Sequence, residues 1–353
     1  MNKMIKPKHE DKTENIWQVK AGDGKRDYSD VFLQFGVMLI GPGTESSDYR
    51  KNKHKYKNHR PLRQFADEAS ENDLVVLNVP WGTKWAAKAV GKIRSSYSFE
   101  PVFSEVEYFE LQHCRRIEWK ELTRVTPIRG LGRGGSFFSH VNNEEARKEV
   151  ERLWEEGKLN EPDKIPLDPE EISSDELIDS LTAKGLPREK AKHIAVETQR
   201  LKDLANWYYH NDDYDVGEHE ARTFLVVPLI KSLGWDEKHV KIEWEHKDVV
   251  LFDKPYSPRS KPLILIESKR LWDALGDDPE QQAKKYTESN RTCDRLVITD
   301  GIRYKLFTKP TRFGKWVFSH YLNLLAPKRV HPYKPEVGGA VSFLLKMRPG
   351  AAI

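Results

Sequence analysis

The sequence predicts a multidomain protein with a mostly β N-terminal domain, a helical linker and an α/β C-terminal domain. Three observations lead to this prediction. The length of 353 residues exceeds one average domain. Short strand-like runs such as "VFLQFGVMLIG" and "DLVVLNV" fill the first third of the chain, and strand-like runs alternate with helical runs after Glu218. We place the domains at 1–128, 129–205 and 206–353.

The N-terminal runs are punctuated by Gly, Pro and Asn, with few long helical patterns, which is typical of a small β barrel. A glycine-rich joint, "IRGLGRGGS", closes this domain. The middle segment contains "EEARKEVERLWEEG" and "SSDELIDSLTAKG", whose apolar residues recur at helical spacing. Ser173 or Ser174 is the expected N-cap of the second of these helices.

Composition excludes several classes of protein. Hydrophobic residues make up 38% and charged residues 32% of the chain, and no run approaches the roughly 18 apolar residues of a membrane span. The first residues lack the apolar core of a signal peptide, so we expect a cytoplasmic protein with no membrane partner. Cys114 and Cys293 belong to no metal-spacing motif. Mildly basic ends flank an acidic middle, which suits two modules that face a polyanion.

The run "LILIESKRL" ends in an acid and a base two residues apart, Glu267 and Lys269. Residues two apart on a strand point to the same face, and Asp248 opens another short apolar strand, "DVVLF", shortly before. Two carboxylates beside an ammonium suit Mg²⁺, which can polarise a phosphodiester and lower the pKa of a bound water. The alternative is a solvated strand end, because so highly charged a chain produces this pattern by chance.

The C-terminal segment resembles the PD-(D/E)XK nuclease superfamily, in particular the nuclease domain of type I restriction motor subunits. The resemblance runs in order from Glu218 to about Phe307, through "VVPLIKSLGW", Asp248, the strand with Glu267 and Lys269, "QAKKY" and "LVITDG". It implies that Asp248, Glu267 and Lys269 are catalytic, and that the two acids bind the Mg²⁺ cofactor.

The same resemblance implies that Gln282 and Tyr286 of "QAKKY" line the active site. Four residues apart on a helix, they share a face, although an ordinary amphipathic helix has the same pattern. An acid on the first helix completes the implied site. Family spacing favours Glu218, four residues before Arg222, and Glu220 is close enough to compete.

Aromatic residues are frequent in the N-terminal domain, where stacked rings could hold a base turned out of a helix. The alternative for each ring is ordinary core packing. The motifs "IWQVKAGDG", "FGVMLIGPG", "DLVVLNVPWG" and "LQHCRRIEW" resemble the PUA-like family that includes EVE and YTH domains, which read modified bases. We choose Trp17, Trp81 and Trp85 as base-binding residues because they lie near glycine-rich turns.

The stretch "RKNKHKYKNHRPLR", residues 50–63, is strongly basic and contains no acid. We expect a mobile arm that contacts the DNA backbone through Lys51, Lys53, Lys55 and Lys57 without reading sequence. A disordered, solvated loop is the alternative, and the two interpretations are compatible.

Together these features predict a modification-dependent, type IV-like restriction endonuclease that acts in phage defence. Its N-terminal domain would recognise a modified base in double-stranded DNA, and its C-terminal domain would hydrolyse phosphodiesters with Mg²⁺. One active site cuts one strand, so a double-strand break requires a homodimer or two successive nicks. Two alternatives stay open: a sequence-specific restriction nuclease acting on unmodified DNA, and a non-catalytic reader of modified RNA.

Overall fold

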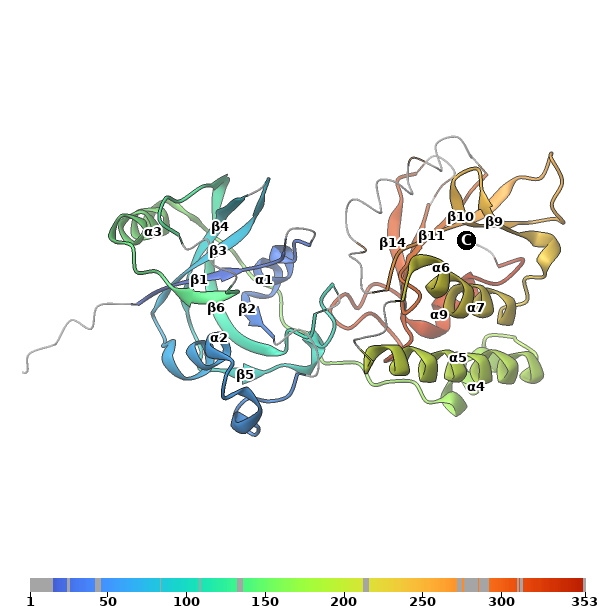
Figure 1. Cartoon of the computed structure of the whole chain (residues 1–353), viewed down its shortest axis with the longest axis horizontal. Helices are drawn as coiled ribbons and strands as arrows, with labels where there is room; N and C mark the ends of the chain where they lie inside the picture. The colour runs from blue at the N-terminus through green and yellow to red at the C-terminus, as the bar shows by residue number, and fades with distance from the viewer. Residues whose placement is uncertain are drawn as a thin grey trace, which may run out of the picture. The chain divides into compact units, whose positions relative to one another are not determined.

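The computed structural model forms two compact units, Met1–Ile165 and Pro166–Ile353, which are described separately (Figure 1). The structure describes residues 15–23, 26–41, 46–82, 84–107, 109–131, 136–211, 216–271, 275, 285, 292–309, 311 and 314–351. Within this part of the chain, no helix has the length and apolar character needed to cross a membrane. The division into two units agrees with the expectation of a multidomain protein.

The first unit is built on one mixed sheet, whose main path runs β2-β6-β4-β3-β1-β7. Its strands are β1 (Ile16–Lys20), β2 (Val37–Ile40), β3 (Leu74–Trp81), β4 (Lys84–Ile93), β5 (Ser98–Phe99), β6 (His113–Thr126), β7 (Phe138–His140) and β8 (Lys158–Leu159). Strands β1 and β3 pair in parallel and the other pairs are antiparallel; β5 and β8 both join β6. The expectation of a mostly β N-terminal unit is therefore confirmed.

Short helices surround this sheet: α1 (Ser29–Phe35), η1 (Lys53–Tyr56), α2 (Arg60–Arg63), η2 (Gln64–Glu68), η3 (Pro101–Phe103) and α3 (Glu144–Glu156). Helix α3 begins at the N-cap Asn143, whose side chain accepts a hydrogen bond from the Ala146 amide. Its buried residues Ala146, Val150 and Leu153 recur at helical spacing and pack on the sheet. This helix therefore belongs to the first unit.

The second unit contains a six-stranded sheet in the order β14-β13-β12-β11-β10-β9. The strands are β9 (Val240–Trp244), β10 (Lys247–Phe252), β11 (Pro262–Ser268), β12 (Arg295–Thr299), β13 (Arg303–Thr308) and β14 (Val317–Asn323). Only β11 and β12 pair in parallel among these six. A parallel pair needs a long connection, and 26 residues, 269–294, separate β11 from β12 in the chain.

Helices gather on one side of this sheet in Figure 1: α4 (Ser174–Ala183), α5 (Arg188–Tyr209), α6 (Glu218–Ala221), η4 (Arg222–Val226), α7 (Val227–Ser232) and α9 (Ala340–Lys346). A short η5 (Glu237–His239) precedes β9. The main core lies between these helices and the side chains of one sheet face, including Val249, Leu251 and Ile266. A second cluster, including Val250, Phe252 and Leu265, covers the opposite face.

The helical segment expected at 129–205 is not a separate linker in this structure. Helix α3 packs in the first unit, whereas α4 and α5 contribute Leu181, Ala191 and Ile194 to the core of the second. The boundary falls between Ile165 and Pro166 because α3 packs on the sheet of the first unit, whereas α4 and α5 pack on each other and on α9 and α7 of the second. Of the two expected caps of α4, Ser173 and Ser174, the N-cap is Ser173, which forms a reciprocal capping box with Glu176.

Candidate functional site

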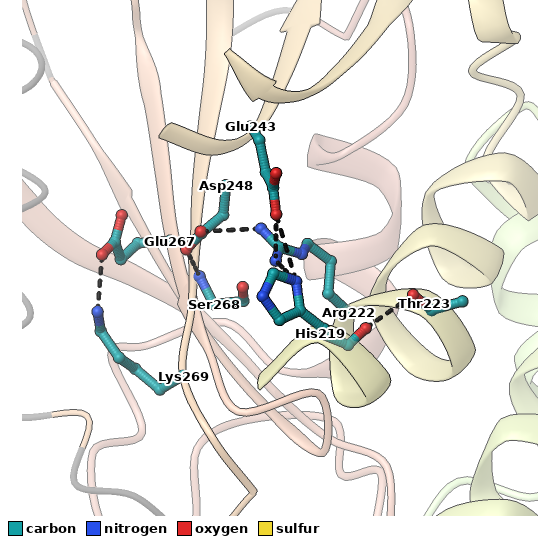
Figure 2. Close-up of polar contacts among 8 residues, drawn as sticks. All are labelled: His219, Arg222, Thr223, Glu243, Asp248, Glu267, Ser268 and Lys269. Carbon is teal, nitrogen blue, oxygen red and sulfur yellow. Dashed lines mark hydrogen bonds and ion pairs between the residues drawn. The ribbon is translucent and has the colours of Figure 1, made fainter. Parts of the chain in front are cut away.

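The second unit brings two of the predicted acids together at the ends of neighbouring strands (Figure 2). Val249 of β10 pairs with Ile266 of β11, so one further step of this antiparallel register sets Asp248 opposite Glu267. Side chains opposite each other on antiparallel strands lie on the same face, with Cβ atoms about 4.5–5.5 Å apart. The fold thus joins two carboxylates that are distant in sequence.

Lys269 completes this group, because its Nζ lies 2.7 Å from Glu267 Oε1. Glu267 is only 5% exposed, so the alternative of a solvated strand end does not hold for it. Burial raises the pKa of Glu267, although the Lys269 hydrogen bond opposes this shift. Burial acts to lower the pKa of Lys269, but the hydrogen bond to Glu267 and the neighbouring carboxylates outweigh it, so that pKa is raised. The ammonium is therefore firmly charged.

Both oxygens of Asp248 are held. The backbone N–H of Ser268 donates to Oδ2 at 2.8 Å, and the Arg222 guanidinium donates from Nη1 to Oδ1 at 2.9 Å. An ionised carboxylate has about four lone-pair positions, and Glu218 is a third hydrogen-bond partner of Asp248, so about one position is left for another ligand. The side chain is thus fixed in direction and can still accept a ligand.

Arg222 is the site residue that sequence reasoning did not single out. It begins η4, and its side chain is only 4% exposed. Its Nη2 lies 3.2 Å from Glu243 Oε1 and 2.5 Å from His219 Nδ1. A guanidinium only donates, so the His219 contact requires an unprotonated Nδ1. The spacing from Glu218 to Arg222 was visible in the sequence, but the acids that pair with Arg222 come from strands β9 and β10.

The structure also separates the two candidates for the first-helix acid. Glu218 opens α6, and its pKa is raised by burial and then by the negative charge of Asp248, while the charge of Lys269 opposes the shift. Glu220 instead accepts a hydrogen bond from the Tyr208 hydroxyl at 3.5 Å. Glu218 is therefore the acid that faces the group. Gln282 and Tyr286 lie outside the described residues.

The carboxylates of Asp248 and Glu267 are the candidate ligands of the expected Mg²⁺. Among the described residues, no three His, Cys, Asp or Glu side chains are arranged to hold a metal ion. Mg²⁺ usually takes only one or two carboxylates from a protein and fills its other positions with water and phosphate. Asp248 and Glu267 fit that chemistry, and they are the residues that would hold the ion.

In the first unit, Trp17 lies in the core. Its indole is 2% exposed and stacks on Phe138, with ring centroids 4.9 Å apart. Its Nε1 donates to Asp73 Oδ2 at 2.8 Å, so its polar atom is also satisfied inside the protein. This burial argues against the base-binding role expected for Trp17.

Trp81 and Trp85 lie on a tight hairpin but point to opposite faces of it. In the β3–β4 register Trp81 pairs with Lys84 and Pro80 pairs with Trp85, and neighbouring positions on a strand alternate in direction. Trp81 is 50% exposed, and Trp85 is half-buried with Lys20 Nζ 4.9 Å from its ring centroid. The two indoles therefore do not form the walls of one cage.

The basic stretch 50–63 is folded, which differs from the mobile arm that we expected. It forms η1 and α2 and is anchored by the buried Tyr56, whose hydroxyl accepts a hydrogen bond from the Ser47 amide at 2.7 Å. Two of its lysines face acids that flank the stretch: Lys53 lies 3.1 Å from Asp67, and Lys51 lies 3.9 Å from Asp48. Lys55 and Lys57 are exposed.

Comparisons with known proteins add little to this geometry. No protein-family model matches the chain, and no curated protein matches it. Among solved structures, the chain is similar to the YTH domain of the Zygosaccharomyces rouxii MRB1 protein, determined in complex with N6-methyladenosine RNA. The match has 11% sequence identity and a TM-score of 0.24, and it covers 42% of this chain and 88% of that one. A TM-score this low does not establish a shared fold.

Proposed function

We propose that this protein is a Mg²⁺-dependent endodeoxyribonuclease that cuts DNA containing modified bases, with a role in phage defence. The second unit would hydrolyse the phosphodiester and the first unit would select the DNA. One observation carries the catalytic half of the proposal. The buried Glu267 and the partly exposed Lys269 form a pair beside Asp248, where two neighbouring strands bring their polar ends together.

Each of these side chains has a role in the proposed reaction. Asp248 and Glu267 would hold Mg²⁺, which when bound polarises a phosphodiester and activates a water. Lys269 orients Glu267 through their hydrogen bond, and its side chain is 18% exposed, so the ammonium can also reach a phosphate oxygen. A fixed positive charge at that position stabilises the negative charge that develops on the phosphate during attack.

The order of elements supports the proposed PD-(D/E)XK fold of the second unit. Helix α6 and its continuation precede three consecutive antiparallel strands, and a crossover then leads to β12, which is parallel to β11. The sequence resemblance implies this order. The catalytic roles of Gln282 and Tyr286 are part of the same proposal.

The selecting role of the first unit rests on exposed groups that suit nucleic acid. Trp81 presents half of its surface to solvent, and exposed aromatic rings can stack on bases. Lys55 and Lys57 are exposed on the basic stretch, where ammonium groups suit phosphates. Binding of a modified base by a PUA-like domain is the proposed basis of selection, and a homodimer would supply the second cut.

The test is digestion of matched modified and unmodified phage DNA by the purified protein, with Mg²⁺ or with a chelator. We expect cleavage of the modified DNA only, and only with Mg²⁺. Equal cleavage of both DNAs would favour the sequence-specific alternative. Binding to modified RNA without cleavage of any DNA would favour the non-catalytic reader. Glu267→Gln, prepared in the same way, controls for a contaminating nuclease.

A further inference from the structure

Arg222 is a buried cation placed between two carboxylates of different exposure. Its Nη1 contacts Asp248, whose side chain is 17% exposed, and its Nη2 contacts Glu243, whose side chain is 60% exposed. The guanidinium itself is almost fully enclosed. An arginine is rarely buried unless its charge is paired, so this contact network is an integral part of the site.

We propose that Arg222 is a positioning residue for Asp248. We also propose that its positive charge partly neutralises the cluster of acids Glu218, Asp248 and Glu267. This inference rests on the proposed function. Two separable effects follow. The planar guanidinium of Arg222 fixes the direction in which Asp248 presents its free lone-pair position. Its charge offsets the mutual repulsion of the acids before a divalent cation binds.

The positioning effect follows from geometry. The Ser268 amide holds one oxygen of Asp248 and Arg222 holds the other, so the carboxylate plane is set by two bonds from different elements. A guanidinium presents several N–H groups in a rigid plane and can reach Asp248 and Glu243 together. A lysine has one ammonium on a flexible stem and would not reproduce this bridge.

The charge effect follows from the acids nearby. Asp248 and Glu267 lie opposite each other on neighbouring antiparallel strands, so two carboxylates share one face. Arg222 and Lys269 are cations in direct contact with this group. Removing Arg222 makes the net charge of the site more negative, which favours binding of a divalent cation. It also removes the hydrogen bond that fixes the direction of the Asp248 side chain.

Glu243 reaches Arg222 from the hairpin of β9 and β10. Its φ is +53°, a left-handed conformation that is uncommon for a residue with a side chain. Glu243 lies between the paired positions Ile242 and Trp244 of β9, opposite Asp248 in the register. Glu245 and His246 of the same hairpin also have positive φ, so this conformation belongs to the turn, and Glu243 forms its ion pair with Arg222 from it.

The test measures Mn²⁺ binding by calorimetry alongside cleavage of modified DNA, in the full-length protein. We expect Arg222→Met to bind Mn²⁺ about threefold to tenfold more tightly, because a neighbouring positive charge is removed. The same variant should cleave at least about tenfold more slowly at saturating metal, because Asp248 is no longer fixed. Arg222→Lys retains the charge, so its Mn²⁺ affinity should stay within about twofold of the parent while its cleavage still falls.

Glu245→Gln is the matched control, because Glu245 is an exposed acid on the same hairpin that pairs with Lys247 and not with Arg222. Both of its readouts should equal those of the parent. The inference is overturned if folded Arg222→Met binds Mn²⁺ no more tightly than the parent, or if Arg222→Lys cleaves at the parental rate. Circular dichroism checks folding, and Arg222→Lys alone decides the matter if the methionine variant does not fold.

The two proposals fail in different ways. If the parent binds Mn²⁺ through Asp248 and cleaves DNA, but the Arg222 variants do not behave as described, the inference about Arg222 fails alone. If the parent does not cleave DNA, and Asp248→Asn binds Mn²⁺ as tightly as the parent, the nuclease proposal fails. The role of Arg222 then fails with it.

Discussion

Gly301 packs directly against Leu225: a Cβ built on Gly301 would lie 2.9 Å from Leu225 Cδ1 and 3.3 Å from the Cβ of Ala221. Gly301 follows β12, and the other two residues belong to α6 and η4, which carry Glu218 and Arg222. The absent side chain therefore lets this helical segment approach the sheet. That approach brings Glu218 and Arg222 within reach of Asp248.

Replacement of Gly301 by Ala should destabilise the second unit and slow cleavage. The φ of Gly301 is +91°, and Gly185 has the same φ with nothing within 4 Å of a built Cβ. Gly185→Ala therefore measures the backbone strain alone, about 1–2 kcal/mol. We expect Gly301→Ala to cost about 1–3 kcal/mol more because of overpacking. Urea unfolding of both variants measures the difference, and equal costs would show that the contact with Leu225 is unimportant.

Loss of either central carboxylate should abolish cleavage and leave DNA binding largely intact. Asp248→Asn and Glu267→Gln keep the shape of each side chain but remove the charge that would hold Mg²⁺. We expect cleavage of modified DNA to fall by at least about two orders of magnitude. Glu237→Gln, an exposed acid that pairs with Lys231, is the control and should cleave normally. Near-normal cleavage by either central variant would remove the catalytic role from that residue.

Substitutions of the three tryptophans should have different effects on the stability of the protein and on its affinity for DNA. Trp17→Phe removes the bond to Asp73 and some core volume, so it should cost about 1–3 kcal/mol of stability without changing DNA discrimination by the folded protein. Trp81→Ala should change stability by less than about 0.5 kcal/mol, but weaken DNA binding by removing a stacking interaction of about 1–3 kcal/mol. Trp85→Ala tests the other face of the hairpin. Unchanged binding by both surface variants would place base recognition elsewhere.

The basic stretch should contribute unequally to the salt dependence of DNA binding. All four lysines are exposed, but Lys51 and Lys53 each face an acid, Asp48 and Asp67 respectively. For Lys55→Gln with Lys57→Gln, we expect the slope of log affinity against log salt to become shallower by about 0.9 for each phosphate that is no longer neutralised. The matched change at Lys51 and Lys53 should have a smaller effect. Binding to modified and unmodified DNA should weaken by similar factors, and an unchanged slope would exclude phosphate contacts.

Acidification should weaken the first unit through His113. This imidazole is fully buried, with its Nδ1 2.8 Å from the Tyr97 hydroxyl, and burial lowers its pKa to about 4. The ordinary pKa is 6.5, so the unfolded chain takes up a proton first as pH falls. The stabilisation is therefore complete above about pH 6.5 and is lost progressively towards pH 4, by up to about 3 kcal/mol.

Denaturant unfolding between about pH 7.5 and about pH 4.5 measures this effect. The free energy of unfolding of His113→Gln should depend less steeply on pH than that of the parent, because the titrating group is gone. His54→Gln, an exposed histidine of the same unit, is the control. Identical pH profiles for the parent and His113→Gln would contradict the prediction.

Local patterns in the sequence are sufficient to predict the features that depend on neighbours along the chain. Helical spacing indicated the helices of the middle segment, and Ser173 caps α4 together with Glu176, which is close to it in the chain. Strand alternation indicated that Glu267 and Lys269 share a face, and their hydrogen bond follows from that spacing. Backbone geometry sets these relationships within a few residues, so local patterns are sufficient to predict them.

Tertiary structure alone decided which side chains are buried and which distant groups meet. Trp17 and Trp81 are both tryptophans near glycines, yet strand register places one in the core and leaves the other half exposed. Helices α3 and α4 follow each other in the chain, yet α3 packs on the sheet of the first unit and α4 packs on helices α5 and α9 of the second. Arg222 pairs with Glu243 and Asp248, which lie 21 and 26 residues further along the chain and reach it on β9 and β10. Burial and charge pairing arise from contacts across the fold, and a local pattern does not contain them.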